Sequence, residues 1–140
     1  MISKLIHIYN NNKKEIKLFL KYCIVGVSNT IVGLGTILIL YNIFKVDYRL
    51  SNIIGYTLGL INSFILNKMW TFRSKSVFYK EIIPFFLFFL VSYIINLGAV
   101  VFCVEILLIN KNISQLIGMV FYTSTNFIGN RLWTFKNELL

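Results

Sequence analysis

Four long apolar stretches constrain the fold of this chain more than any other feature of its sequence. They span residues 22–44, 50–70, 83–109 and 113–133. Each reaches the ~20 residues that an α-helix needs to cross the hydrocarbon core of a bilayer. Hydrophobic residues make up 57% of the chain, and the mean hydropathy is +0.74, which a soluble domain of this size would not show. We therefore predict an all-α, polytopic membrane protein with four transmembrane helices.

The sequence between these stretches is too short to form another folded domain. We divide the chain into a basic N-terminal segment, residues 1–17, and a four-span membrane domain, residues 18–136. Pro84 suits the first turn of a helix, so we expect the third helix to begin near it. The first apolar run is too long for a signal peptide, and the N-terminus should be retained. The N-terminal segment fits either a helix on the membrane surface or a mobile basic tail.

Positive charges are distributed unevenly between the two sides of the predicted membrane domain. Eleven Lys and Arg residues fall on one side and three on the other. The larger group comprises Lys4, Lys13, Lys14, Lys17, Lys21, Lys68, Arg73, Lys75, Lys80, Arg131 and Lys136; the smaller comprises Lys45, Arg49 and Lys111. Because cytoplasmic loops are enriched in cations, we place both termini in the cytoplasm and the protein in the cytoplasmic membrane. The net charge of +9 then reflects topology and attraction to membrane lipids, and no nucleic-acid partner is needed.

Residues that support redox, metal or bond-changing chemistry are scarce. Cys23 and Cys103 should differ in depth by roughly 25 Å, too far for a disulfide within the chain. The single histidine, His7, lies in the N-terminal segment. No nucleophile, paired carboxylate or metal-ligand constellation appears, so we expect neither a cofactor nor an enzyme.

A short motif occurs twice, as "NKMWTFRS" from Asn67 and as "NRLWTFKN" from Asn130. One offset of 63 residues relates the two copies, and it also places Ser51 on Ser114 and Gly55 on Gly118. The second and fourth apolar stretches are therefore copies of each other. The first and third match weakly, sharing an apolar run and a small residue, Gly26 or Ser92. We predict two parallel two-helix repeats related by an axis along the membrane normal.

Polar side chains lie at helical spacing within the apolar stretches. An amide that faces lipid is costly because hydrocarbon offers it no hydrogen-bond partner. The amides that should therefore point inward are Asn29, Asn62, Asn67, Asn126 and Asn130. One interpretation is structural: the amides bridge helices, while Trp70, Trp133 and the adjacent cations anchor the helix ends. The other is that these groups together hold a polar headgroup on a lipid tail.

The paired motifs resemble a known family. "KYCIVGVSNT", "NSFILNKMWTF" and "TNFIGNRLWTF" are similar to segments of the GtrA-like family of small four-span membrane proteins, and the resemblance runs from about Leu18 to Phe135. It implies translocation of polyprenyl-phosphate-linked sugars, made by a partner membrane glycosyltransferase, toward cell-surface polysaccharide or teichoic acid. This chain departs from the pattern by having Lys68 where Arg is common, and by lacking a basic-aromatic start to its third span.

Under this interpretation the substrate-binding residues would be Lys21, Asn29, Asn62, Asn67, Lys68, Trp70, Asn126, Asn130, Arg131 and Trp133. Cations can pair with the phosphate, amides can bind sugar hydroxyls, and Trp can stack on a sugar ring. The prenyl tail would stay in lipid. A homodimer, or a complex with the glycosyltransferase, would supply more protein surface around the headgroup. The sequence leaves both assemblies open.

Two other functions remain as alternatives. A non-transporting scaffold that recruits a glycosyltransferase would need the same membrane domain. A small proton-coupled multidrug exporter would need a carboxylate well inside the first span, which has none. Glu105 is expected at the outer interface, where it can reach water.

Overall fold

The computed structural model describes the backbone of residues 2–136 and the side chains of residues 13–136. Four long helices fill this range: α1 (Ile2–Leu38), α2 (Tyr48–Leu66), α3 (Phe78–Val101) and α4 (Lys111–Gly129). Each continues into a five-residue π-helical turn: η1 (Ile39–Ile43), η2 (Asn67–Thr71), η3 (Phe102–Ile106) and η4 (Asn130–Thr134). No strand occurs among residues 2–136. The predicted all-α class is confirmed.

The four helices differ in how apolar they are. The segments Lys13–Ile43 and Phe78–Ile106 are each long and apolar enough by themselves to cross a membrane. The helices α2 and α4 carry more polar groups, and several of these, including Ser51 and Ser114, lie on a buried side. Their other faces expose large apolar side chains, with Tyr56 72% and Met119 60% accessible. Such faces suit a hydrocarbon environment.

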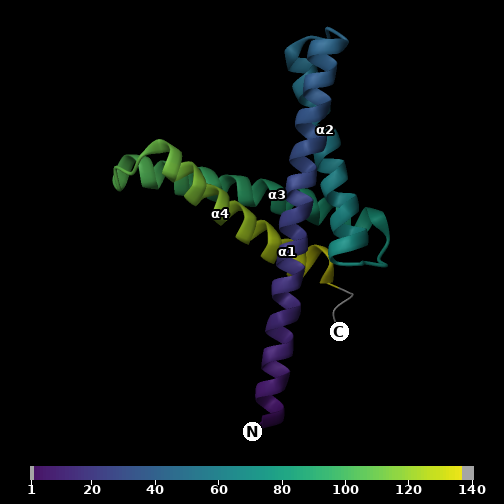
Figure 1. The fold of residues 1–140 in the computed structure, drawn as a ribbon, viewed down its shortest axis with the longest axis vertical. Helices are drawn as coiled ribbons and strands as arrows, with labels where there is room; N and C mark the ends of the chain where they lie inside the picture. The colour runs from purple at the N-terminus through teal and green to yellow at the C-terminus, as the bar shows by residue number, and fades with distance from the viewer. Residues whose placement is uncertain (1, 137–140) are drawn as a thin grey trace. The chain divides into compact units, whose positions relative to one another are not determined.

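The chain divides between Arg73 and Ser74 into two compact units, and each is a helical hairpin. In the first unit α1 packs along α2, and in the second α3 packs along α4 (Figure 1). We call the end of each hairpin that carries Trp70 or Trp133 its Trp end, and the opposite end, where two helices join, its loop end. The two predicted two-helix repeats correspond to these two hairpins.

The loop ends of the two hairpins are built alike. Lys45 and Leu108, related by the 63-residue offset, both adopt left-handed backbone angles, with φ of 54° and 53°. Asp47 caps α2 by accepting from the backbone N–H groups of Arg49 and Leu50, and Asn110 caps α4 by accepting from the backbone N–H group of Asn112. Short polar side chains at these positions satisfy N–H groups that have no partner within the helix.

The Trp ends show that α1 and α3 are copies as well. The rings of Tyr22 and Phe72 lie 6.2 Å apart at 60°. Those of Phe85 and Phe135, one offset later, lie 6.3 Å apart at 58°. Phe85 thus occupies the place of Tyr22, and Ser92 occupies the place of Asn29. Matching Gly26 with Ser92 from sequence was wrong by about one helical turn.

One expectation about helix starts needs correction. Pro84 does not open a helix, because α3 begins at Phe78 and Pro84 lies inside it. Its missing N–H group removes one hydrogen bond, to the carbonyl of Lys80, without ending the helix. For the N-terminal segment, where the sequence left a surface helix and a mobile tail open, the backbone of α1 is helical from Ile2 into the first span.

Candidate functional site

Lys21 and Trp70, 49 positions apart in sequence, meet at the Trp end of the first hairpin. The Lys21 Nζ donates to the backbone carbonyl of Trp70 over 3.3 Å. The same ammonium lies 5.1 Å from the centroid of the Trp70 ring, a cation–π distance. Trp70 remains 39% exposed. Two predicted site residues on different helices are therefore brought together.

Further cations surround this contact. The positive charges of Arg73 and Lys17 both act on the Lys21 ammonium, and Lys68 lies half-buried in η2 just before Trp70. Clustered cations produce a local positive potential that attracts anions. Sequence reasoning had counted Lys17 and Arg73 only as topology signals. The signal that could have found them is spacing: Lys17 is one helical turn from Lys21, and Arg73 directly follows the Trp-Thr-Phe motif.

The amides of the first hairpin mostly join its two helices. Asn62 Nδ2 donates to the Ser28 hydroxyl of α1 over 3.2 Å. Asn29 packs against Gly59 so closely that a Cβ atom there would lie 2.5 Å from its Oδ1. These contacts match the structural interpretation of interhelical hydrogen bonding and close packing. Asn67 differs, since it is 1% exposed and its Nδ2 donates to Ser63 of its own helix over 3.4 Å.

The amides of the second hairpin form a ladder along one helix instead. Asn130 Nδ2 donates to Asn126 Oδ1 over 2.7 Å, and Asn126 Nδ2 donates to the Tyr122 hydroxyl over 3.2 Å. Both amides are buried. The spacing of four residues places all three side chains on one face of α4 and η4. Tyr122 is not among the site residues predicted from sequence.

The Trp end of the second hairpin differs from that of the first. Pro84 stands at the position of Lys21, so α3 offers no cation there, as its sequence indicated. The Trp133 ring is 62% exposed and lies 5.6 Å from the Phe88 ring. Glu81 stands in the place of Leu18; it is 2% exposed and accepts a hydrogen bond from the Ser74 hydroxyl. Arg131 lies half-buried in η4.

Some buried polar atoms at the Trp ends have no hydrogen-bond partner among the described residues. They include Asn67 Oδ1, Thr71 Oγ1 and Thr134 Oγ1. Buried polar atoms in folded proteins are almost always hydrogen-bonded, so each such atom needs an explanation. The two threonines are repeat mates, which makes an isolated packing defect a poor explanation. Both lie in π-helical turns, which recur at functional sites, although η1 and η3 carry no such atoms.

The remaining ionisable and thiol groups form no metal-binding cluster among residues 13–136. No three His, Cys, Asp or Glu side chains within that range gather to hold a metal. Cys23 and Cys103 are both free. Glu105 is exposed in η3, at the loop end of the second hairpin.

The chain is similar to known membrane proteins over most of its length. The family model described as GtrA/DPMS, transmembrane domain, matches residues 21–135. The Bacillus subtilis "Uncharacterized membrane protein YngA" is 34% identical over 134 residues, 91% of this chain and 85% of that protein. Bacillus subtilis YwcD, likewise named an uncharacterized membrane protein, is 27% identical over 82% of this chain and 94% of its own. The Listeria monocytogenes "Cell wall teichoic acid glycosylation protein GtcA" is 25% identical over 87% of each chain.

Proposed function

The chain belongs to the GtrA/DPMS transmembrane-domain family, and on that premise we propose that it translocates, or helps to translocate, a polyprenyl-phosphate-linked monosaccharide across the cytoplasmic membrane. The sugar would serve the glycosylation of a surface polysaccharide or teichoic acid, a process that appears in the name of the relative GtcA. A membrane glycosyltransferase would load the lipid. The match to the family model confirms the family resemblance inferred from the Trp-Thr-Phe motifs.

The observation that carries this proposal is the contact between Lys21 and Trp70 within a group of cations. An aromatic ring, a cation fixed above it and further positive charges are what a sugar phosphate at a membrane surface requires. A helix anchor needs a Trp and a nearby cation. A helix anchor does not need an ammonium from another helix that donates a hydrogen bond to the backbone carbonyl of the Trp.

The chemistry is that of binding and transfer through the membrane, not of bond cleavage. Moving a phosphate through ~30 Å of hydrocarbon is prohibitive unless its charge is partly neutralised and its hydroxyls are hydrogen-bonded. We place the Trp ends at the cytoplasmic face, where each hairpin offers cations to a phosphate: Lys21 and Lys68 in the first hairpin, and Arg131 in the second. The buried amides Asn67, Asn126 and Asn130 then offer hydrogen bonds deeper in the membrane. The prenyl chain remains in lipid against the exposed apolar helix faces.

The first test measures binding and translocation with the purified full-length chain in liposomes. The double variant Lys68→Gln, Arg131→Gln should bind a polyprenyl-phosphate-linked hexose about ten-fold or more weakly, because each change removes a charge-assisted contact of about 1.5 to 3 kcal/mol. The matched control is Lys45→Gln, Lys111→Gln, which removes two cations from the loop ends. Wild-type affinity in the first variant would return both residues to an anchoring role.

Two conservative exchanges refine this test. Guanidinium is a planar fork that can bind phosphate in a bidentate manner, whereas ammonium is a point charge. Since the first repeat has Lys68 where the second has Arg131, we expect Arg131→Lys to weaken binding more than Lys68→Arg does. Unaided movement of the lipid-linked sugar by the wild type would also exclude a non-transporting scaffold.

A further inference from the structure

The hydrogen-bond ladder of the second hairpin has a direction. Each amide donates toward the middle of the helix, from Asn130 to Asn126 and from Asn126 to Tyr122. The Tyr122 hydroxyl therefore accepts, and its own hydrogen must be donated elsewhere. Among the described residues no acceptor receives it: the one hydrogen bond of this hydroxyl is that from Asn126. An accepted bond also polarises the hydroxyl and strengthens it as a donor.

Packing does not require this hydroxyl. The Tyr122 ring meets Phe89 of α3 edge to face, with centroids 6.3 Å apart, and the hydroxyl makes no hydrogen bond to α3 among the described residues. A phenylalanine would make the same ring contact. In the first hairpin the equivalent residue is Gly59, where any side chain would collide with Asn29. At this equivalent position the first repeat has a glycine that lets the helices pack closely, while the second repeat has the hydroxyl of Tyr122.

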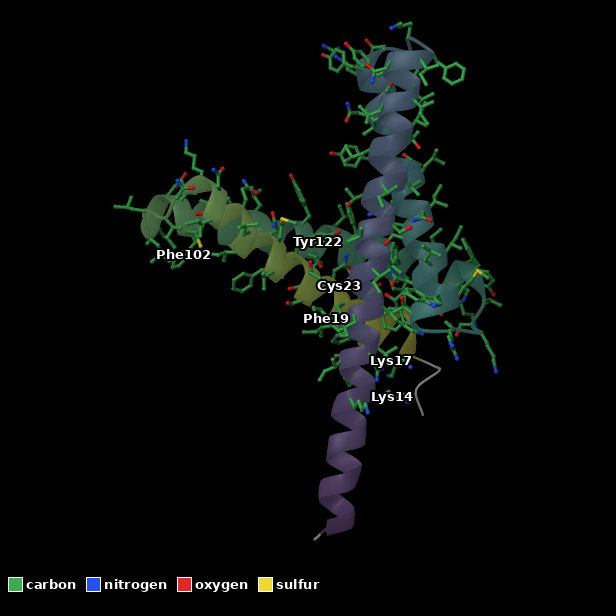
Figure 2. The ribbon with its side chains drawn as sticks, in the orientation of Figure 1. Lys14, Lys17, Phe19, Cys23, Phe102 and Tyr122 are labelled. Carbon is green, nitrogen blue, oxygen red and sulfur yellow. The ribbon has the colours of Figure 1, made fainter. Side chains whose placement is uncertain are left out.

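The position of Tyr122 assigns the hydroxyl to an intermediate stage of transport. It lies midway between the ends of the segment formed by α4 and η4, and Figure 2 labels it along α4. Nine residues separate it from Arg131, a rise of roughly 13 Å. Toward the loop end the hairpin has an open groove of about 550 Å³, whose lining, including Gly98, Phe102 and Ile117, contains no amide or hydroxyl side chain. A headgroup advancing from the Trp end would meet its last ladder donor at Tyr122.

We propose that the Tyr122 hydroxyl donates a hydrogen bond to an oxygen of the sugar headgroup in transit, and that it sets the rate of translocation without setting the affinity of the first binding step. This inference rests on the proposed function and deepens it. It assigns the cations at the Trp ends to capture of the phosphate. It assigns the Tyr122, Asn126 and Asn130 ladder to passage of the sugar.

The test compares Tyr122→Phe with Tyr93→Phe, which removes a hydroxyl from an exposed tyrosine of α3. Liposomes containing each full-length variant receive a polyprenyl-phosphate-linked hexose, and binding and initial translocation rates are measured separately. We expect Tyr122→Phe to lower the rate about three- to ten-fold with affinity within two-fold of wild type. Tyr93→Phe should change neither. Thermal unfolding of both variants reports any loss of folded protein.

Each outcome bears on the inference. A wild-type rate in Tyr122→Phe, beside an active wild type, would overturn the role of the hydroxyl and leave the proposed function intact. An equal rate loss in Tyr93→Phe, or a loss explained by the amount of folded protein, would overturn it as well. Failure of the wild type to bind the lipid-linked hexose would overturn the proposed function and this inference together. Binding without movement would overturn this inference and leave the chain an assisting role.

Discussion

Thr71 and Thr134 are buried threonines whose hydroxyl groups lack a hydrogen-bond partner among the described residues. They are 2% and 5% exposed. An unpaired buried hydroxyl costs about 1 to 3 kcal/mol, whereas an apolar group of the same shape does not carry that cost. In the proposed site these hydroxyls would bond to the headgroup or to waters around it. The cost is then recovered on binding.

This leads to a prediction for the double variant Thr71→Val, Thr134→Val. Without ligand, its free energy of unfolding should equal that of the wild type or exceed it by about 1 kcal/mol. With a polyprenyl-phosphate-linked hexose present, its affinity should fall, because two donors are lost. Thermal unfolding in detergent, with and without this lipid, measures both effects. A clear loss of stability without ligand would show that the hydroxyls already have partners in the membrane.

Thr57→Val is the matched control for this pair. Thr57 is exposed, and its hydroxyl donates to the carbonyl of Ile53 on its own helix over 2.7 Å. Its valine variant should leave the affinity for the lipid-linked hexose unchanged. An equal loss of affinity in the control would mean that the effect does not arise at the Trp ends.

At the scale of single residues, the two interpretations of the amides divide by position. Asn29 and Asn62 contact the neighbouring helix, and this packing explains why they point inward. Asn126 and Asn130 are joined to each other and to Tyr122 by hydrogen bonds along their own helix. The residues that carry the functional argument are therefore fewer than the inward amides as a set.

At the scale of helices, the crossing of α1 and α2 depends on glycine. A Cβ atom at Gly55 would lie 2.7 Å from the backbone oxygen of Gly33 and 2.4 Å from Ile37 Cγ1. Side chains can turn away from such a clash, but the backbone of a packed helix cannot do so without shifting the helix. Gly26 has nothing within 4 Å of the same position. Close approach of the helix backbones thus requires glycine at position 55 and does not require it at position 26.

We expect Gly55→Ala to lower the free energy of unfolding by about 1 to 3 kcal/mol, as overpacking does. Gly26→Ala should leave it unchanged or raise it by about 0.5 to 1 kcal/mol, since alanine favours a helix over glycine. Chemical unfolding in mixed micelles would compare the two variants. Equal stability in both would contradict the tight contact between Gly33 and Gly55.

The helices also show where sequence is informative and where it is not. The number of helices follows from apolar length, and the α2 and α4 correspondence follows from the repeated Trp-Thr-Phe motif. The α1 and α3 register was missed, because most of their surfaces need only be apolar and so retain little sequence similarity. The ring pairs around Tyr22 and Phe85 reveal it. Pro84 was misread because a proline can be accommodated inside a membrane helix.

The same reasoning explains the site residues that sequence missed. Lys17 and Arg73 belong to a long series of cations, and nothing in the sequence separates those near Lys21 from those that only set topology. Glu81 gave no signal because its burial depends on the fold of the second hairpin. Tyr122 lies four residues before Asn126, but the direction of the hydrogen bond between them is known only from atomic positions.

At the scale of the whole molecule, the uneven distribution of cations predicts one orientation of the protein in the membrane. The loop ends carry Lys45, Arg49 and Lys111, while the other eleven cations lie toward the Trp ends or in the N-terminal segment. Cytoplasmic loops hold the excess of Lys and Arg. The proposed capture of a lipid-linked sugar made in the cytoplasm requires the same orientation, because the phosphate-binding cations must face the compartment where the lipid is loaded.

Single cysteines in a Cys23→Ala, Cys103→Ala background test this orientation. Tyr48 and Lys111 at the loop ends are exposed, and neither provides the helix cap, which Asp47 and Asn110 supply; Lys75, between the two hairpins, is exposed as well. We expect cysteines at Tyr48 and Lys111 to react with a membrane-impermeant thiol reagent added to intact cells. A cysteine at Lys75 should react only after the cells are opened. The reverse pattern would place Lys21, Lys68 and Arg131 at the outer face, where they could not capture a lipid loaded in the cytoplasm. Reaction at all three positions in intact cells would mean that the chain inserts in both orientations, and the charge difference would then be too weak to define a single direction of transport.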